Sequence, residues 1–300
     1  MSVTDPRRDA PAVLPPWMGG RRRRLLAAAL GLAAFAAAVA ALAWNRETMV
    51  ESLAAARSAS PWLALGLAAG SAGQVVMSGL VFWMLYRIRV RIPPFDTTAI
   101  IAASNAANFL PLRPGLVGRV AYLRIRYGVP LAVSVRVTVE AAGLMALVTV
   151  FVVLFLAFGT RTGLPGIASL PVAALVALLA LNSPIFRPYA VAALGRLVET
   201  GLLSWRYALA FSLTGREIDA DAAIAFACIA SAASMIPLVP NGLGVREWAI
   251  GLLAPVVAGH SLEEGLAAEL VNRAVELLVT VPIGAAAAAW LARRPAAVSR

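Results

Sequence analysis

Six long apolar segments dominate this sequence and limit what it can fold into. They are residues 25–44, 62–85, 137–158, 164–181, 220–238 and 266–291. A helix of roughly 20 apolar residues crosses the hydrocarbon core of a bilayer, and each segment is close to that length or longer. The sequence therefore predicts an all-α, polytopic integral membrane protein. We expect six transmembrane helices, or up to eight if weaker segments also cross.

The composition excludes the soluble alternatives. Hydrophobic residues make up 61% of the chain and charged residues only 14%, and the mean hydropathy is +0.82. So little polar surface cannot cover soluble cores, and no polar stretch is long enough to form a separate catalytic domain.

The basic residues narrow the choice of partners. All 26 of them are arginine, against 15 acidic residues. A GC-rich coding background explains this bias; the functional alternative is that guanidinium groups bind phosphate with two hydrogen bonds and stay charged in a membrane. The arginines are scattered at segment ends, so nucleic acid is not an expected partner. Cys228 and His260 stand alone, so we expect no metal and no cofactor.

Flanking arginines orient the segments. Residues 21–24 are four arginines before the first segment, and Arg87, Arg89 and Arg91 follow the second. Because cytoplasmic loops are enriched in basic residues, we expect a cytoplasmic N-terminus and a bacterial-type inner membrane. The chain then divides into a basic tail (1–24), a transmembrane domain (25–292) and a C-terminal tail (293–300). The first segment is too long for a signal-peptide core and is expected to remain as an anchor.

Three weaker segments lie between the strong ones. Residues 97–112 include Asn105, and a full crossing there would place the next five arginines outside, so a broken or re-entrant segment is predicted. Residues 197–213 carry Arg206 at their centre and form either an interfacial helix or a poor span. Residues 248–258 are too short to cross alone.

Two Pro/Gly-rich motifs, at residues 110–119 and 236–246, resemble each other. With small shifts, each reads Pro-Leu-x-Pro, then Gly-Leu, a second Gly and an Arg. Prolines end helices, glycines let the backbone turn, and the amides that start the next helix can hold an anion. Interrupted apolar segments in two halves of a membrane chain indicate a transporter binding site, here for a phosphate beside arginines.

The second motif carries a family resemblance. The stretch Pro237-x-x-Pro240-Asn241-Gly242-Leu243-Gly244-Val245-Arg246-Glu247 resembles the late signature of the lysylphosphatidylglycerol synthase transmembrane, or flippase-like, family. The pattern Asn108-x-x-Pro111-x-Arg113-x-Gly115-x-x-x-Arg119 resembles its early signature, and Asn272-Arg273 with Glu276 resembles its late arginine-bearing helix. The resemblance covers about residues 62–290. Two features depart from the family pattern. The acidic residue that usually follows the glycine of the first motif is Leu116 here. The Glu-Arg pair with a later Asp on the next span is reduced to Glu140 alone.

The resemblance implies a multi-pass helical protein that moves or binds an amphiphilic lipid. Aminoacylated phospholipids, polyprenyl phosphates and hopanoid-type lipids are the classes it suggests. In the synthase, a soluble aminoacyl-transferase domain follows the membrane unit. The present sequence ends at Arg300, so lipid aminoacylation is not expected.

Charged residues inside apolar segments are expected to be paired or to line a watery cavity. Glu140 follows Arg136 by four residues, and Glu269 precedes Arg273 by four, so each pair shares a helix face and can neutralise itself. Glu140, Arg273 and Glu276 are expected to face a cavity.

Two adjacent charged residues at the second motif are expected to have different roles. Arg246 and Glu247 point in different directions on a helix, so one can face the ligand while the other caps the helix start.

A lipid translocase is favoured over two alternatives. These are a non-catalytic subunit or scaffold for lipid-biosynthesis enzymes, and a membrane transferase, for which the sequence offers only scattered glutamates as acid or base. Membrane lipids are the expected partners. No catalytic residues are assigned. The predicted headgroup and translocation path comprises Asn108, Pro111, Arg113, Gly115, Arg119, Glu140, Pro237, Pro240, Gly242, Gly244, Arg246, Glu247, Arg273 and Glu276.

Overall fold

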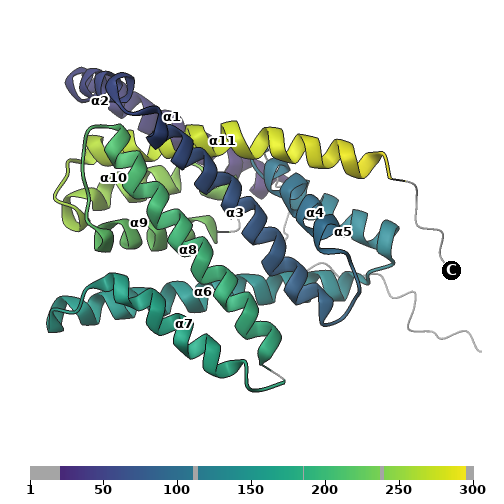
Figure 1. Cartoon of the computed structure of the whole chain (residues 1–300). Coiled ribbons are helices and arrows are strands. Elements are labelled where there is room, and N and C mark those ends of the chain that lie inside the picture. Colours follow the sequence, from purple (N-terminus) through teal and green to yellow (C-terminus); the bar gives the residue numbers. More distant parts are fainter. Residues whose placement is uncertain (1–20, 111–113, 185, 237–239, 295–300) are drawn as a thin grey trace, which may run out of the picture.

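The computed structural model describes residues 21–110, 114–184, 186–236 and 240–294 (Figure 1). Within these residues it is all-helical and contains no strand, as predicted. The helices are α1 (Arg21–Trp44), α2 (Arg46–Ser58), α3 (Pro61–Arg87), α4 (Pro94–Ala107), α5 (Pro114–Tyr127), α6 (Leu131–Thr162), α7 (Ser169–Ala180), α8 (Arg187–Leu213), α9 (Ala220–Ser234), α10 (Val245–Val257) and α11 (Leu262–Ala292). Short 3-10 turns occupy Gly166–Ala168 and Pro240–Gly242.

Three helices are long and apolar enough to cross a membrane: α3, α6 and α11. The bent pair of α1 and α2, whose axes differ by 91°, makes a fourth if it counts as one span. On α6, large apolar side chains are exposed, among them Val139, Val150, Leu154 and Phe158. Contiguous exposed apolar surface marks contact with lipid or with another protein. These helices are compatible with a protein embedded in a membrane.

The centre of the bundle is the packed pair α3 and α8, which run side by side along the same diagonal of Figure 1. Glycines on α3 permit the close approach: a Cβ on Gly70 would lie 2.8 Å from Cγ of Arg206. The segment 197–213 is therefore the second half of a buried helix of 27 residues, which contacts α3, α7, α9 and α11. Within this segment, Glu199 pairs with Arg196 and Arg206 lies 3.4 Å from Glu276 of α11.

Helices α4 and α5 form a hairpin. At its base, the hydroxyl of Tyr127, the last residue of α5, donates to the carboxylate of Asp96 in the first turn of α4. At its tip, the Leu116 amide donates to Oδ1 of Asn108 at 3.1 Å. The chain doubles back here, which agrees with a broken segment at 97–112. Helix α5 was not predicted from the sequence, because its arginines interrupt the apolar pattern.

Helices α9 and α10 form a second hairpin. At its base, Nε2 of His260, which follows α10, lies 2.9 Å from the carbonyl oxygen of Glu217, which precedes α9. At its tip, Asn241, Gly242 and Gly244 all have positive φ, at 46°, 70° and 81°. The glycines thus turn the backbone as the motif predicts. Helix α9 ends at Ser234, four residues before the predicted end of its segment.

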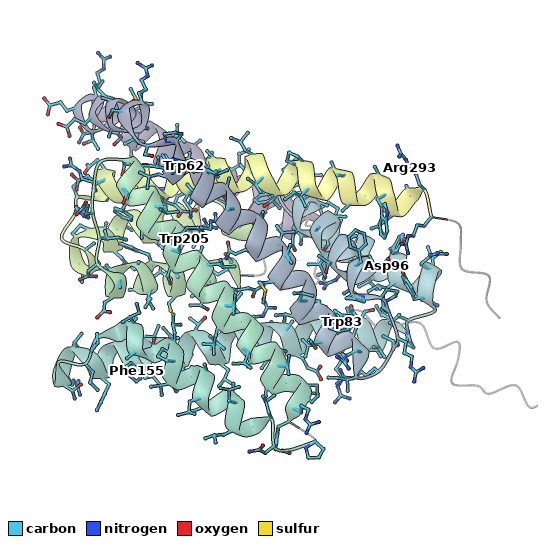
Figure 2. All side chains as sticks on the ribbon, in the orientation of Figure 1. Trp62, Trp83, Asp96, Phe155, Trp205 and Arg293 are labelled. Carbon is cyan, nitrogen blue, oxygen red and sulfur yellow. The ribbon has the colours of Figure 1, made fainter. Side chains whose placement is uncertain are left out.

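Helix α11 runs beside both hairpins and places their bases at opposite ends of the bundle. Arg294, just after α11, pairs with Asp96 at 2.8 Å, whereas Glu264, in its first turn, pairs with His260 at 3.3 Å. Figure 2 shows Asp96 and Arg293 together at one end of the molecule and Trp62 towards the other. The two hairpin tips therefore meet beside the middle of α11.

Candidate functional site

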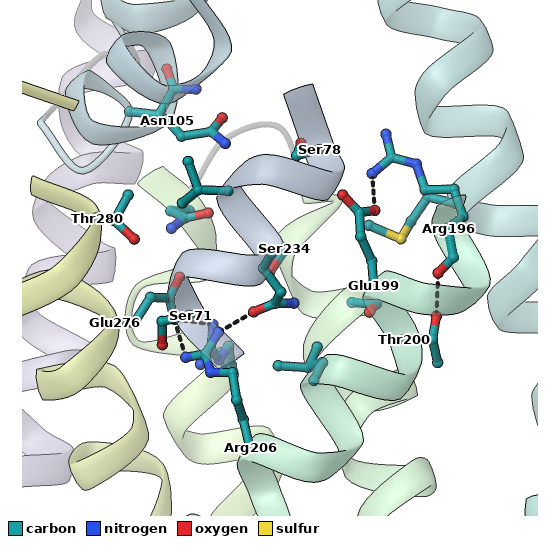
Figure 3. Close-up of a pocket in the computed structure, with 18 of the residues that line it drawn as sticks. Ser71, Ser78, Asn105, Arg196, Glu199, Thr200, Arg206, Ser234, Glu276 and Thr280 are labelled. Carbon is teal, nitrogen blue, oxygen red and sulfur yellow. Dashed lines mark hydrogen bonds and ion pairs between the residues drawn. The ribbon is translucent and has the colours of Figure 1, made fainter. Parts of the chain in front are cut away.

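A polar cavity of about 200 Å³ lies where the hairpin tips meet (Figure 3). It is lined by α3, α4, α6, α8, α9, α10 and α11 and by the turn that leads into α10. Most of the residues that line it have polar side chains, although the helices around it are apolar. The polar lining residues are Ser71, Gln74, Ser78, Asn105, Asn108, Arg196, Glu199, Thr200, Arg206, Ser231, Ser234, Asn241, Arg246, Glu276 and Thr280.

Arg206 of α8 reaches across the bundle to α3 and α11. Its guanidinium donates to the side-chain oxygen of Gln74 and, at 2.7 Å, to Oδ1 of Asn272. It also lies 3.4 Å from Oε2 of Glu276 (Figure 3). Only 2% of the Arg206 side chain is exposed, so its charge is neutralised by these partners rather than by water.

Arg246, the arginine of the second motif, lies between two carboxylates of α11. Its Nε is 2.5 Å from Glu269 and its Nη1 is 2.9 Å from Glu276. Glu269 also accepts a hydrogen bond from Tyr207 at 2.7 Å. Arg246 thus lines the cavity with its charge already paired.

Arg273 connects the two hairpin tips. It donates to the carbonyl oxygen of Asn241 at 2.9 Å, and its guanidinium lies over the ring of Phe109, 5.2 Å from the centroid. Its acidic neighbours are Glu247 at 3.5 Å and Glu276 at 3.6 Å. Glu276 consequently serves three arginines, and it is the one acid of this group that lines the cavity.

Glu247 caps the start of α10. Its Oε2 accepts the Gly244 amide hydrogen at 2.6 Å, and its side chain is buried. The predicted difference in role between the two residues is therefore observed in part: Glu247 caps the helix, and Arg246 lines the cavity. The Gly244 amide, which the motif suggested for an external anion, is occupied by a carboxylate of the chain itself.

A separate ion pair forms another part of the wall. Arg196 and Glu199 of α8 are 2.5 Å apart, and both side chains are only 6% exposed. Figure 3 shows them across the cavity from Arg206 and Glu276. Both cationic and anionic side chains therefore line the cavity.

The structure brings together part of the predicted path. Asn108, Arg246 and Glu276 line the cavity, and Glu247 and Arg273 contact that group. Pro240 and Gly242 form the 3-10 turn beside Asn241, with Gly244 just after it. Pro111, Arg113 and Pro237 lie outside the described residues.

Three predicted residues lie elsewhere. Glu140 does not line the cavity; it accepts two hydrogen bonds from Arg89, at 2.6 and 2.9 Å, and one from Arg136 at 3.0 Å. Arg119 donates to Thr138 at 2.7 Å and lies over the ring of Phe82. Gly115 has a packing role, because a Cβ there would clash with the Ser104 carbonyl of α4.

Sequence reasoning missed several lining residues and one pairing. Arg206 was visible as a charge in the middle of an apolar segment, but it was interpreted as a weakness of the span rather than as a site residue. Arg196 and Glu199 lie just before and at the start of this segment, so they carried no such signal. The predicted Glu269–Arg273 pairing is wrong, because Glu269 pairs with Arg246 from the neighbouring helix.

An apolar cavity of about 290 Å³ lies between α6, α7 and α8. Leu144 and Leu197 line it, whereas Met145 and Arg196, the residues beside them in sequence, line the polar cavity. Helices α6 and α8 therefore have one face towards each cavity.

Comparisons with protein-family models, with curated proteins and with solved structures find no match to this chain.

Proposed function

We propose that this chain is a lipid translocase of the flippase-like type, whose polar cavity admits the headgroup of an amphiphilic lipid. The observation that carries the proposal is a cavity with paired arginines and glutamates inside an apolar bundle, at the meeting point of two broken helix pairs. Such interrupted helices at the midplane are where transporters bind their substrates. The residue patterns at 108–119 and 237–247 support the assignment to the flippase-like family.

The apolar cavity supplies a place for the lipid tail. A lipid has a polar and an apolar end, and here α6 and α8 each line both a polar and an apolar cavity. Hydrocarbon packed between α6, α7 and α8 stays in a bilayer-like environment while the headgroup is in the polar cavity. The pair of cavities thus fits an amphiphile better than a free anion.

We further propose a topology of six crossings, α1, α3, α6, α7, α8 and α11, with α4–α5 and α9–α10 as re-entrant hairpins. The hairpin helices α4, α5, α9 and α10 have 14, 14, 15 and 13 residues, or about 20 Å each, too short for a hydrocarbon core of about 30 Å. Helix α7 is short too, but it must return the chain from the end of α6 to the start of α8. This arrangement keeps both termini in the cytoplasm of a bacterial-type cell, as the arginines indicate.

Filling the cavity tests the proposal. Ser234 lines it and donates to the carbonyl oxygen of Ala230 in the preceding turn. Ser58, on an exposed face of α2, makes the same bond to Ala54. Purified wild type, Ser234→Leu and Ser58→Leu are reconstituted into liposomes with trace lipids that carry a fluorophore on an acyl chain. Dithionite is then added outside the liposomes. It bleaches the labelled lipids in the outer leaflet, so continued loss of fluorescence measures transfer from the inner leaflet.

We expect transfer by wild type and Ser58→Leu, and a loss of about tenfold or more in Ser234→Leu, equivalent to at least 1.4 kcal/mol in the barrier. Wild-type rates in folded Ser234→Leu would contradict the role of the cavity. No transfer by the wild type with any lipid tested would overturn the proposal and favour a scaffold role.

A further inference from the structure

The charges around the polar cavity are balanced on each side. On one wall, Arg196 and Glu199 are a single buried pair at 2.5 Å. Thr200 contributes a hydroxyl that donates to the Arg196 carbonyl and adds no charge. This wall therefore has a net charge of zero.

The other wall combines three arginines with three glutamates. Each arginine has an acidic neighbour within 4 Å, and each glutamate has a basic one. The six residues are Arg206, Arg246 and Arg273 with Glu247, Glu269 and Glu276. In the described part of the chain, this wall also has a net charge of zero.

Charge balance restricts what can enter. An unpaired charge inside a membrane costs several kcal/mol, and its energy rises because the surroundings screen it poorly. A ligand with a net charge would leave one group without a partner, whereas a ligand with one cation and one anion would not. From this balance, and resting on the proposed function, we infer that the cavity selects a net-neutral, zwitterionic lipid headgroup over an anionic one.

Glu276 is placed so that a headgroup phosphate can replace it as the partner of the arginines. It lines the cavity and contacts Arg206, Arg246 and Arg273 at 3.4, 2.9 and 3.6 Å, as a phosphate would. A headgroup phosphate takes over one or more of these contacts. The carboxylate that is released then faces the ammonium of the same headgroup, so no charge stays unpaired.

The test compares two headgroups of similar size and different charge. Phosphatidylethanolamine is zwitterionic and phosphatidylglycerol is anionic, and each carries its fluorophore on an acyl chain so that the headgroup is unchanged. Their transfer rates are measured in liposomes of otherwise identical composition. We expect the wild type to transfer phosphatidylethanolamine about tenfold faster, the ratio that an energy difference of 1.4 kcal/mol produces.

Variants that change the charge of the cavity walls test whether charge balance, rather than cavity shape, causes the headgroup preference. Glu276→Gln and Glu199→Gln each remove one negative charge, from opposite walls of the cavity, and each is expected to shift the ratio towards phosphatidylglycerol by about tenfold. The double variant Arg206→Gln/Glu276→Gln restores a net charge of zero, so it should restore the wild-type preference. Glu51→Gln, on α2, removes an exposed acid and should leave the ratio unchanged.

The outcomes distinguish this inference from the proposed function. Transfer of both lipids at equal rates by the wild type, or an unchanged ratio in active Glu276→Gln and Glu199→Gln, overturns the zwitterion preference and leaves the translocase intact. A wild type that moves neither of these lipids but moves another overturns the zwitterion preference alone, and a wild type that moves no lipid tested overturns both. If Glu276→Gln does not fold, Glu199→Gln decides.

Discussion

At the scale of single residues, Arg246 illustrates how the network limits simple mutagenesis. The side chain is 4% exposed and lies between Glu269 and Glu276. Removing one partner of a buried ion pair leaves the other uncompensated, at a cost of about 3–5 kcal/mol. We therefore expect Arg246→Met to lower the free energy of unfolding by about that amount, and Arg246→Met/Glu269→Gln to recover part of it. Thermal unfolding in detergent measures both.

The matched comparison is an arginine whose pair is exposed. Arg136 contacts Glu140 at 3.0 Å, but 67% of its side chain is exposed. Exposed pairs contribute roughly 1 kcal/mol or less, so Arg136→Met should hardly change the unfolding temperature. Equal losses in Arg136→Met and Arg246→Met would contradict the buried network. A loss of lipid transfer in Arg246→Met alone does not identify a ligand contact, because the fold is affected as well.

The sequence indicates which residues gather at the site but not how they pair. Arg273 and Glu276 are three residues apart on one helix, and their contact follows from helical geometry alone. The Glu269–Arg246 pair depends on how α10 packs against α11, which no local pattern encodes. Short-range rules predicted a partner within the helix, and tertiary packing supplied a different one.

At the scale of elements, apolar length predicts α1, α3, α6 and α11 well, because their apolar runs have the length of a span. It fails for α2 and α5, which are rich in charge. Pro/Gly motifs predicted where two segments break. They could not predict that the hairpin bases close through Asp96 with Tyr127 and through Glu217 with His260, since these residues lie far apart in sequence.

The close contact between α11 and α4 leads to a testable prediction at this scale. Gly284 of α11 faces α4, where a Cβ would lie 2.8 Å from the Ala102 carbonyl oxygen and clash with the Ala106 side chain. Overpacking a tight contact costs about 1–3 kcal/mol, so Gly284→Ala should lower the unfolding temperature in detergent. A Cβ on Gly143 of α6 would meet no neighbouring helix within 4 Å among the described residues, so Gly143→Ala should cause no loss. An unchanged unfolding temperature in Gly284→Ala would show that α4 and α11 are not packed in this way.

At the scale of the whole molecule, the two hairpins begin at opposite ends of α11, whose 31 residues extend about 46 Å, enough to cross a bilayer. If α11 crosses, the hairpins enter from opposite faces and their tips meet near the midplane. That is the arrangement of an inverted pair of re-entrant segments. It also explains why one cavity combines residues from both hairpins, Asn105 at the end of α4 and Asn241 at the turn before α10.

Cysteine accessibility tests this topology in intact cells. The native Cys228 is buried and is first replaced by Ala. Single cysteines then replace Arg91, Arg124, Arg161 or Arg293, and a membrane-impermeant maleimide is added. If α4–α5 doubles back, Arg91→Cys and Arg124→Cys lie on the same, cytoplasmic side, and both label only after permeabilisation, as does Arg293→Cys. Arg161→Cys, at the far end of α6, labels directly. Direct labelling of Arg124→Cys would mean that the first broken segment crosses the membrane; the two hairpins would then no longer enter from opposite faces.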